Sequence, residues 1–147
     1  MATASSFLSD KEKHEIALAI HEAEQHTRGE IRVYIEKKCK EDVMDHALKI
    51  FHRLNMHHTK ERNGVLIYVA YDDHVFAILG DKGIHEKVPE NFWDDVKEQL
   101  TKNFAEGKFM EGLKQAILTC GGHLKKHFPE KGKDTNELSD EVAFGNE

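Results

Sequence analysis

Long apolar runs are missing from this sequence. No stretch approaches the roughly 18 consecutive apolar residues that a membrane-spanning helix requires. The N-terminal segment MATASSFLSDKEKHE has no basic region followed by an apolar run. The sequence therefore gives no sign of a membrane span or of a secretion signal, and we expect a soluble, cytoplasmic protein that does not insert into membranes.

Cysteines are few, and neither sign of charge dominates. The chain has two cysteines, Cys39 and Cys120, and without a secretion signal such a pair more often stays reduced than forms a disulfide. The net charge is −6, with acidic and basic residues mixed along the chain rather than grouped in blocks. This mixture argues against nucleic acid or an anionic membrane as a partner.

The length is sufficient for one domain. A chain of 147 residues buries roughly 70% of its unfolded surface, which allows a sizeable core. We assign residues 1–129 to the domain and 130–147 to a polar tail. Within the tail, residues 136–144 regain some apolar character and are expected to dock as a short extra strand. We expect the domain to be monomeric.

The most apolar segments predict a central β-hairpin. Val65–Tyr71 is an unbroken run of large apolar residues, typical of a strand that is buried on both faces. Val75–Leu79 is a second such run, and the break between the two is short enough for a tight antiparallel connection. The outer ends of the hairpin, at Asn63 and Asp81, therefore lie at the same end of the sheet, which we call the base end.

Around this hairpin, the periodicity predicts one more strand and several helices. Residues 30–36 alternate polar and apolar, as in a strand with one buried face, and a helix over 41–56 leads from there to the hairpin. This order implies a right-handed crossover between parallel strands. Further helices are predicted over 10–26, from Pro89 to Gly107 and over 108–129, with 83–89 as an ordered loop. The expected fold class is α/β, with a mixed sheet of about four strands and about four helices.

Several sequence blocks resemble a known family. They are TRGEIRVYI at 27–35, Ala47 with Phe51, RNGVLIYVAYDD at 62–73, ILGDKGI at 78–84 and F-x-x-G-x-F-x-x-G-L at 104–113. In this order and spacing they resemble the TPM domain, named after a thylakoid lumen protein, a photosystem II repair protein and a nematode receptor modulator. The resemblance implies a three-layer α/β/α sandwich and, for some members, divalent-metal binding and weak acid phosphatase activity. With no signal peptide, membrane anchor or glycine-rich tail, the sequence resembles a stand-alone, soluble member.

Oxygen-bearing side chains are predicted to converge at the base end of the sheet. The first strand starts there with Glu30, the parallel strand starts at Asn63, and the antiparallel strand ends at Asp81. The loop and helix that follow carry Glu86 and Asp94. Because carboxylate and amide oxygens suit hard cations, the sequence predicts a Ca²⁺ or Mg²⁺ site here.

The same residues also have a structural interpretation. Glu30 can pair with Arg28 or Arg62, Asp81 can start a turn, and Asp94 can complement a helix dipole. From spacing alone the structural interpretation is favoured. The family resemblance shifts the balance towards metal binding.

The opposite end of the sheet, which we call the tip end, offers a rival site. Asp72 and Asp73 lie there, on the same side as the loop that carries Asp42. α/β sheets commonly bind ligands beyond the carboxyl ends of their strands. Aspartates are also ordinary turn formers, so the sequence leaves both interpretations open.

No motif for covalent catalysis is present. The sequence contains no Gly-x-Ser-x-Gly, Cys-x5-Arg or Asp-x-Asp. Two histidine pairs, His123 with His127 and His57 with His58, are assigned to solvated surface rather than to a transition-metal site. The favoured function is a divalent-cation-binding regulatory or binding module. The alternatives are a metal-dependent phosphatase with low intrinsic activity and a metal-free adaptor for an unidentified protein partner.

Overall fold

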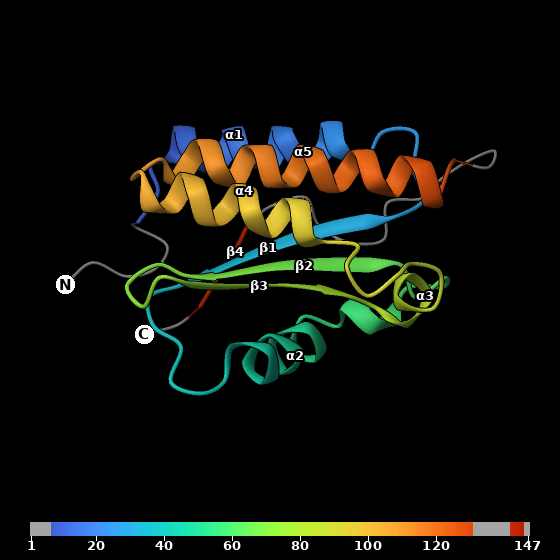
Figure 1. Cartoon of the computed structure of the whole chain (residues 1–147), viewed down its shortest axis with the longest axis horizontal. Coiled ribbons are helices and arrows are strands. Elements are labelled where there is room, and N and C mark those ends of the chain that lie inside the picture. Colours follow the sequence, from blue (N-terminus) through green and yellow to red (C-terminus); the bar gives the residue numbers. More distant parts are fainter. Residues whose placement is uncertain (1–6, 131–141, 146–147) are drawn as a thin grey trace.

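One mixed β-sheet lies between two helical layers in the computed structural model, which describes residues 7–130 and 142–145 (Figure 1). The elements are α1 (Asp10–Ala23), β1 (Glu30–Glu36), α2 (Val43–Arg53), a 3₁₀ turn (Met56–His58), β2 (Gly64–Ala70), β3 (Val75–Gly80), α3 (Lys82–His85), α4 (Asp94–Ala105), α5 (Phe109–His127) and β4 (Ala143–Phe144). Helices α1, α4 and α5 cover one face of the sheet and α2 covers the other. The predicted three-layer α/β/α sandwich is confirmed.

The sheet carries the predicted crossover and hairpin. In the described residues, the strand order is β3-β2-β1-β4. β1 runs parallel to β2, with Glu30 opposite Gly64, and β2 runs antiparallel to β3, with Val65 opposite Gly80. Every residue of β2 is buried, because helices cover both faces of the sheet centre.

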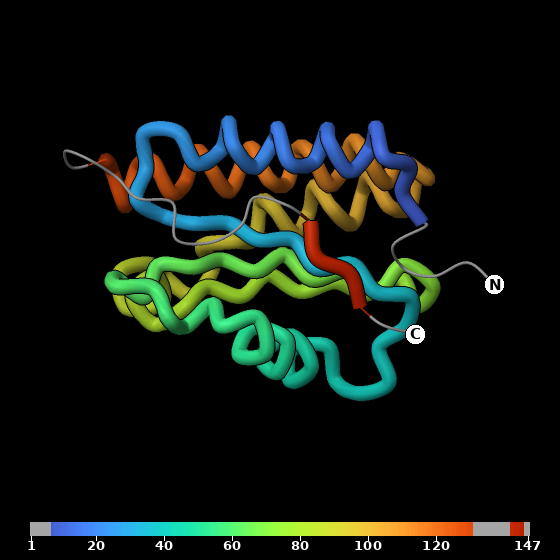
Figure 2. Tube along the Cα trace, turned by 180° about the vertical axis from the view of Figure 1, so that it is seen from behind, coloured from blue at the N-terminus to red at the C-terminus, as the bar shows by residue number. Residues whose placement is uncertain are grey.

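The C-terminal strand β4 lies along the outer side of β1 (Figure 2). Ala143 pairs with Tyr34 and Phe144 with Ile35, in parallel orientation. These two residues belong to the segment 136–144 that was expected to dock as an extra strand, and residues 136–141 lie outside the described part of the chain.

Two apolar cores hold the layers together. The larger joins the sheet to α1, α4 and α5, and includes Ile16, Ile31 and Cys120. The smaller joins the opposite face to α2, and includes Phe51 and Tyr68. Both cysteines are free thiols, and Cys120 is buried. Among the described residues, no helix has the length and apolarity needed to cross a membrane.

Some predicted boundaries were wrong, and local backbone geometry explains why. The segment 83–89 is not wholly a loop, because the Asp81 side chain accepts a hydrogen bond from Lys82 N (2.7 Å) and starts α3. α4 begins at Asp94 rather than at Pro89. α1 and α2 end earlier than predicted, and left-handed residues follow them, His26 (φ 64°) and Asn55 (φ 57°).

Close helix packing explains a glycine in the middle of α5. A Cβ atom on Gly121 would lie 2.7 Å from Ala23 of α1, so only glycine allows the two helices to approach this closely. A pair of glycines inside a helix indicates either a break or a close approach to a neighbouring element. The structure has the close approach, and α5 continues unbroken.

Candidate functional site at the base end of the sheet

Three of the five residues predicted to bind a metal lie at the base end of the sheet. Glu30, Asn63 and Asp81 are all buried. The Glu30 N–H donates to the Asn63 carbonyl (3.1 Å), and the Asp81 N–H donates to the Gly64 carbonyl (2.8 Å). The backbone ladder therefore fixes the relative positions of the three residues, as the hairpin topology predicted.

An arginine holds the Asp81 carboxylate. Arg62 Nε lies 2.7 Å from Asp81 Oδ2, and Arg62 Nη2 lies 2.9 Å from Oδ1. The Asp81 side chain is 5% exposed, whereas the Arg62 side chain is 43% exposed. The carboxylate raises the pKa of Arg62 through these hydrogen bonds. A buried carboxylate needs a positive partner, and here that partner is a half-exposed side chain.

Asn63 contributes a buried oxygen without a partner. Its Nδ2 donates to the Arg28 carbonyl, and its backbone N–H donates to Thr59 Oγ1 (3.3 Å). Its Oδ1 is buried and accepts no hydrogen bond in the described residues. Because an unpaired buried acceptor is destabilising, this oxygen marks the base end as a place where a donor or a cation would be favourable.

Glu86 and Asp94 do not join these three residues. Glu86 is exposed, with its carboxylate 3.9 Å from Lys82 Nζ. Asp94 is exposed in the first turn of α4. Neither forms a hydrogen bond or ion pair with Glu30, Asn63 or Asp81 within the described residues.

The structural interpretation of the base end holds in part. Asp81 does start a turn, as the cap of α3. Arg62 forms an ion pair with Asp81, and Arg28 forms one with Glu61.

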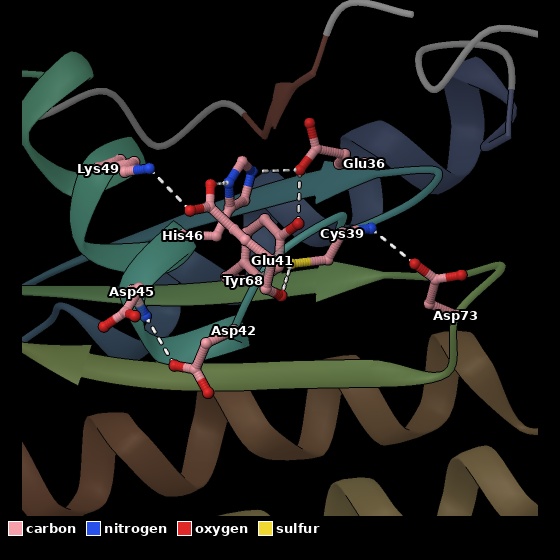
Figure 3. Close-up of polar contacts among 9 residues, drawn as sticks. All are labelled: Glu36, Cys39, Glu41, Asp42, Asp45, His46, Lys49, Tyr68 and Asp73. Atoms are coloured by element: carbon pink, nitrogen blue, oxygen red, sulfur yellow. Dashed lines mark hydrogen bonds and ion pairs between the residues drawn. The ribbon is translucent and has the colours of Figure 1, made fainter.

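Within the described part of the chain, the aspartates at the tip end make different contacts and do not bind one another. Asp42 caps α2 by accepting from Asp45 N (3.1 Å), and Asp73 accepts from Cys39 N (2.7 Å) (Figure 3). The Asp72 carboxylate makes no hydrogen bond or ion pair with the described residues. Asp42 is thus a helix cap, whereas Asp73 lies in the turn between β2 and β3 and its carboxylate binds the loop after β1.

A polar network that the sequence analysis missed links α2 to the sheet (Figure 3). His46 Nε2 lies 2.8 Å from Glu36 Oε2, and His46 Nδ1 lies 2.6 Å from Glu41 Oε2. The Tyr68 hydroxyl donates to the same Glu36 oxygen (2.5 Å), and Lys49 donates to Glu41 (2.7 Å). The available signal was the strand period, which places Glu36 on the same face as Tyr34, towards α2.

The network shifts the pKa values of Tyr68 and Glu41 in opposite directions. Burial and the bond to Glu36 raise the pKa of Tyr68. Hydrogen bonds from Lys49 and His46 lower the pKa of Glu41. These contacts connect α2 and the loop before it to the sheet.

The histidine pairs make aromatic and polar contacts. His123 Nε2 lies 2.8 Å from Asp95 Oδ2, and the His127 ring packs on Phe92 (5.0 Å between centroids). The rings of His57 and His58 are in contact (4.1 Å), and burial, followed by neighbouring histidines, lowers the pKa of His57. Across residues 7–130 and 142–145, no group of three or more histidine, cysteine, aspartate or glutamate side chains is arranged to hold a metal ion.

Comparisons with known proteins identify relatives of this chain. The sequence profile of the TPM domain matches residues 2–122. No curated protein sequence matches. The NMR structure of BA42 from the psychrophilic bacterium Bizionia argentinensis is 43% identical, with a TM-score of 0.91, and the alignment covers 99% of this chain and 100% of BA42.

Two more distant structures share the fold. The N-terminal domain of a protein from P. gingivalis is 17% identical with a TM-score of 0.70, covering 84% of this chain and 82% of that domain. The N-terminal domain of cg2496 from Corynebacterium glutamicum is 10% identical with a TM-score of 0.65, covering 87% of this chain and 80% of that domain. The match over residues 2–122, together with the BA42 structure, shows that the chain belongs to the TPM domain family.

Proposed function

We propose that this chain is a divalent-cation-binding module whose site lies at the base end of the sheet. The ion would be Ca²⁺ or Mg²⁺, because the side chains at this end offer oxygen atoms from two carboxylates and one amide. The residues that would hold it are Glu30, Asn63 and Asp81. The observation that carries the proposal is the buried Asn63 Oδ1 without a partner, at the same end as a buried carboxylate.

Arg62 is the competitor for this site. Its guanidinium occupies both oxygens of Asp81, so a cation must displace it. Since the Arg62 side chain is half-exposed and the carboxylate is not, the arginine is the partner that can move into water. Exchange of one positive partner for another keeps the buried carboxylate compensated throughout.

Thermal unfolding in millimolar Ca²⁺ and in excess chelator tests the proposal. A cation that binds only the folded state at about a hundred times its dissociation constant stabilises by about 2.7 kcal/mol. For a domain near this size, the midpoint should rise by several degrees, at roughly 2–4 °C per kcal/mol. Equal midpoints in Ca²⁺ and chelator would refute cation binding.

The variant Arg62→Gln tests whether the cation uses Asp81. Without the guanidinium the buried carboxylate lacks a partner, so the midpoint in chelator should fall, and the rise on adding Ca²⁺ should exceed that of the wild type. Asp81→Asn should abolish the rise. An unchanged rise in both variants would place the cation elsewhere.

The two alternatives from the sequence have their own readouts. Metal-dependent hydrolysis of a model phosphate ester that disappears in Asp81→Asn would make the same site catalytic, because metal-activated water needs no covalent nucleophile. If the chain is a metal-free adaptor, cations should change neither the unfolding midpoint nor the hydrolysis of the phosphate ester.

A further inference from the structure

A cavity of about 270 Å³ lies at the tip end of the sheet, far along β2 from the proposed cation site. Aromatic side chains form much of its wall, namely Phe7, Tyr71, Phe104 and Phe109. They come from the segment before α1, from the residue after β2, from the last turn of α4 and from the start of α5. Two polar residues, Asp72 and His74, also line the cavity.

The rings support each other from these separate segments. Phe7 stacks on Tyr71 with centroids 3.8 Å apart and planes 5° apart, and it meets the Phe109 ring edge-on at 5.0 Å. Phe104 stacks against Phe109 at 5.1 Å. The Phe7 side chain is nevertheless 37% exposed. Contacts between the rings therefore hold the wall in place, and the wall still exposes apolar surface that a ligand could cover.

Asp72 gives this cavity a charge. Its backbone N–H donates to the Lys37 carbonyl (2.9 Å), which fixes the residue in place. Its carboxylate is exposed and makes no hydrogen bond or ion pair with the described residues. An exposed carboxylate attracts a positive group through its charge, and aromatic rings that line the same cavity add to this attraction wherever a face is open to the ligand.

We propose that this cavity binds a small arylalkylammonium ion. The aromatic part would pack among the rings of Phe7, Tyr71, Phe104 and Phe109, and the ammonium group would meet Asp72. The cavity is slightly smaller than the roughly 300–1,000 Å³ of sites for drug-sized ligands, so it suits a molecule with one ring. The inference does not depend on the cation site at the base end.

Titration of the full chain with 2-phenylethylammonium, followed by NMR in excess chelator, tests the proposal. The expected result is saturable shifts at the backbone amides of Tyr71, Asp72 and Gly107. Uncharged 2-phenylethanol should bind at least about tenfold more weakly, equivalent to about 1.4 kcal/mol. Asp72→Asn should weaken binding of the ammonium by a similar factor, and Phe7→Ala should also weaken it.

The neighbouring Asp73→Asn is the matched control, because Asp73 binds Cys39 N and does not line the cavity. It should leave the affinity for the ammonium within about twofold, a difference well below the tenfold expected for Asp72. The absence of saturable shifts would overturn the proposal. Equal affinity for the amine and the alcohol, or equal affinity in Asp72→Asn and wild type, would overturn it too.

Discussion

At the scale of single residues, the two cysteines differ in burial. Cys120 lies in the core between α5 and the sheet, and burial raises the pKa of its thiol. Cys39 is only partly buried, and its Sγ contacts the Glu41 carbonyl (3.3 Å). Because the thiolate is the reactive form, these two cysteines should differ in reactivity.

We predict that a thiol reagent modifies Cys39 and not Cys120 in the native protein. Mass spectrometry after a short exposure should find one label per chain, and Cys39→Ser should then take up none. Denaturant should expose the second thiol. Two labels on the native wild type would show that the α5 core opens readily.

Tyr68 provides a pH-dependent test of the network around Glu36. Its folded pKa is raised above the unfolded value of about 10. The corresponding stability is therefore complete below about pH 10 and declines as the pH rises from there towards the folded pKa. Tyrosinate absorbance should show a component that appears only as the protein unfolds.

The control for this titration is Tyr68→Phe. This variant should lose part of the tyrosinate absorbance that appears only on unfolding, which we call the late component. Burial also raises the pKa of Tyr34, so a smaller late component should persist in the variant. Ionisation of all 3 tyrosines near pH 10 in a still-folded protein would contradict the burial of the Tyr68 hydroxyl.

At the scale of elements, the packing of α1 on α5 depends on one glycine of an adjacent pair. A Cβ on Gly121 would meet Ala23 at 2.7 Å, whereas a Cβ on Gly122 would meet nothing within 4 Å. The same substitution can therefore be compared at a packed position and at an open position of one helix.

We predict opposite effects of alanine at these two positions. Gly121→Ala forces α1 and α5 apart and should destabilise the protein by about 1–3 kcal/mol. Gly122→Ala should stabilise it by up to about 1 kcal/mol, because alanine has the higher helix propensity. Denaturant unfolding measures both, and similar midpoints for the two variants would contradict the packing of α1 on α5.

The same scale shows where sequence reasoning about elements fails. β1 was predicted with its observed bounds, because alternation over Glu30–Glu36 is a strong local signal. α3 was missed because a helix of 4 residues has no periodicity, and it exists through the Asp81 cap and the hydrogen bond from Gly83 N to the Arg62 carbonyl (2.8 Å). A Cβ at Gly83 would clash with the backbone at Glu61 and Arg62, a contact that only the folded chain reveals.

At the scale of the whole molecule, the sequence predicted which strand ends meet at the base end. It did not predict correctly every residue that lies there. The parallel crossover and the hairpin place Glu30, Asn63 and Asp81 at the same end of the sheet, and both follow from apolar patterning. Glu86 and Asp94 fall outside, since α3 and the start of α4 direct them into solvent. The pairing of Arg62 with Asp81 was not predicted, because Arg62 had been considered only as a partner for Glu30, and the chain turns at Arg62 through a left-handed conformation (φ 53°) that no local pattern indicates.

The tip end was harder to anticipate from sequence. Its aromatic cavity joins residues from the chain's beginning, middle and end, and no local pattern links Phe7 to Tyr71 or Phe109. The Glu36, His46 and Glu41 network likewise needs β1 and α2 in their folded positions. Long-range side-chain contacts of this kind lie beyond what periodicity can specify.

Calorimetric titration of Ca²⁺ into the wild type and four variants tests the central claim most directly. Removing a ligand from a multi-carboxylate site should weaken binding strongly, whereas removing a turn-forming aspartate should mainly reduce fold stability. We predict that Glu30→Gln and Asp81→Asn each lower the Ca²⁺ affinity at least about tenfold, or about 1.4 kcal/mol. Asp72→Asn and Asp73→Asn should leave it nearly unchanged. The reverse pattern would place the cation at the tip end and contradict the proposed site.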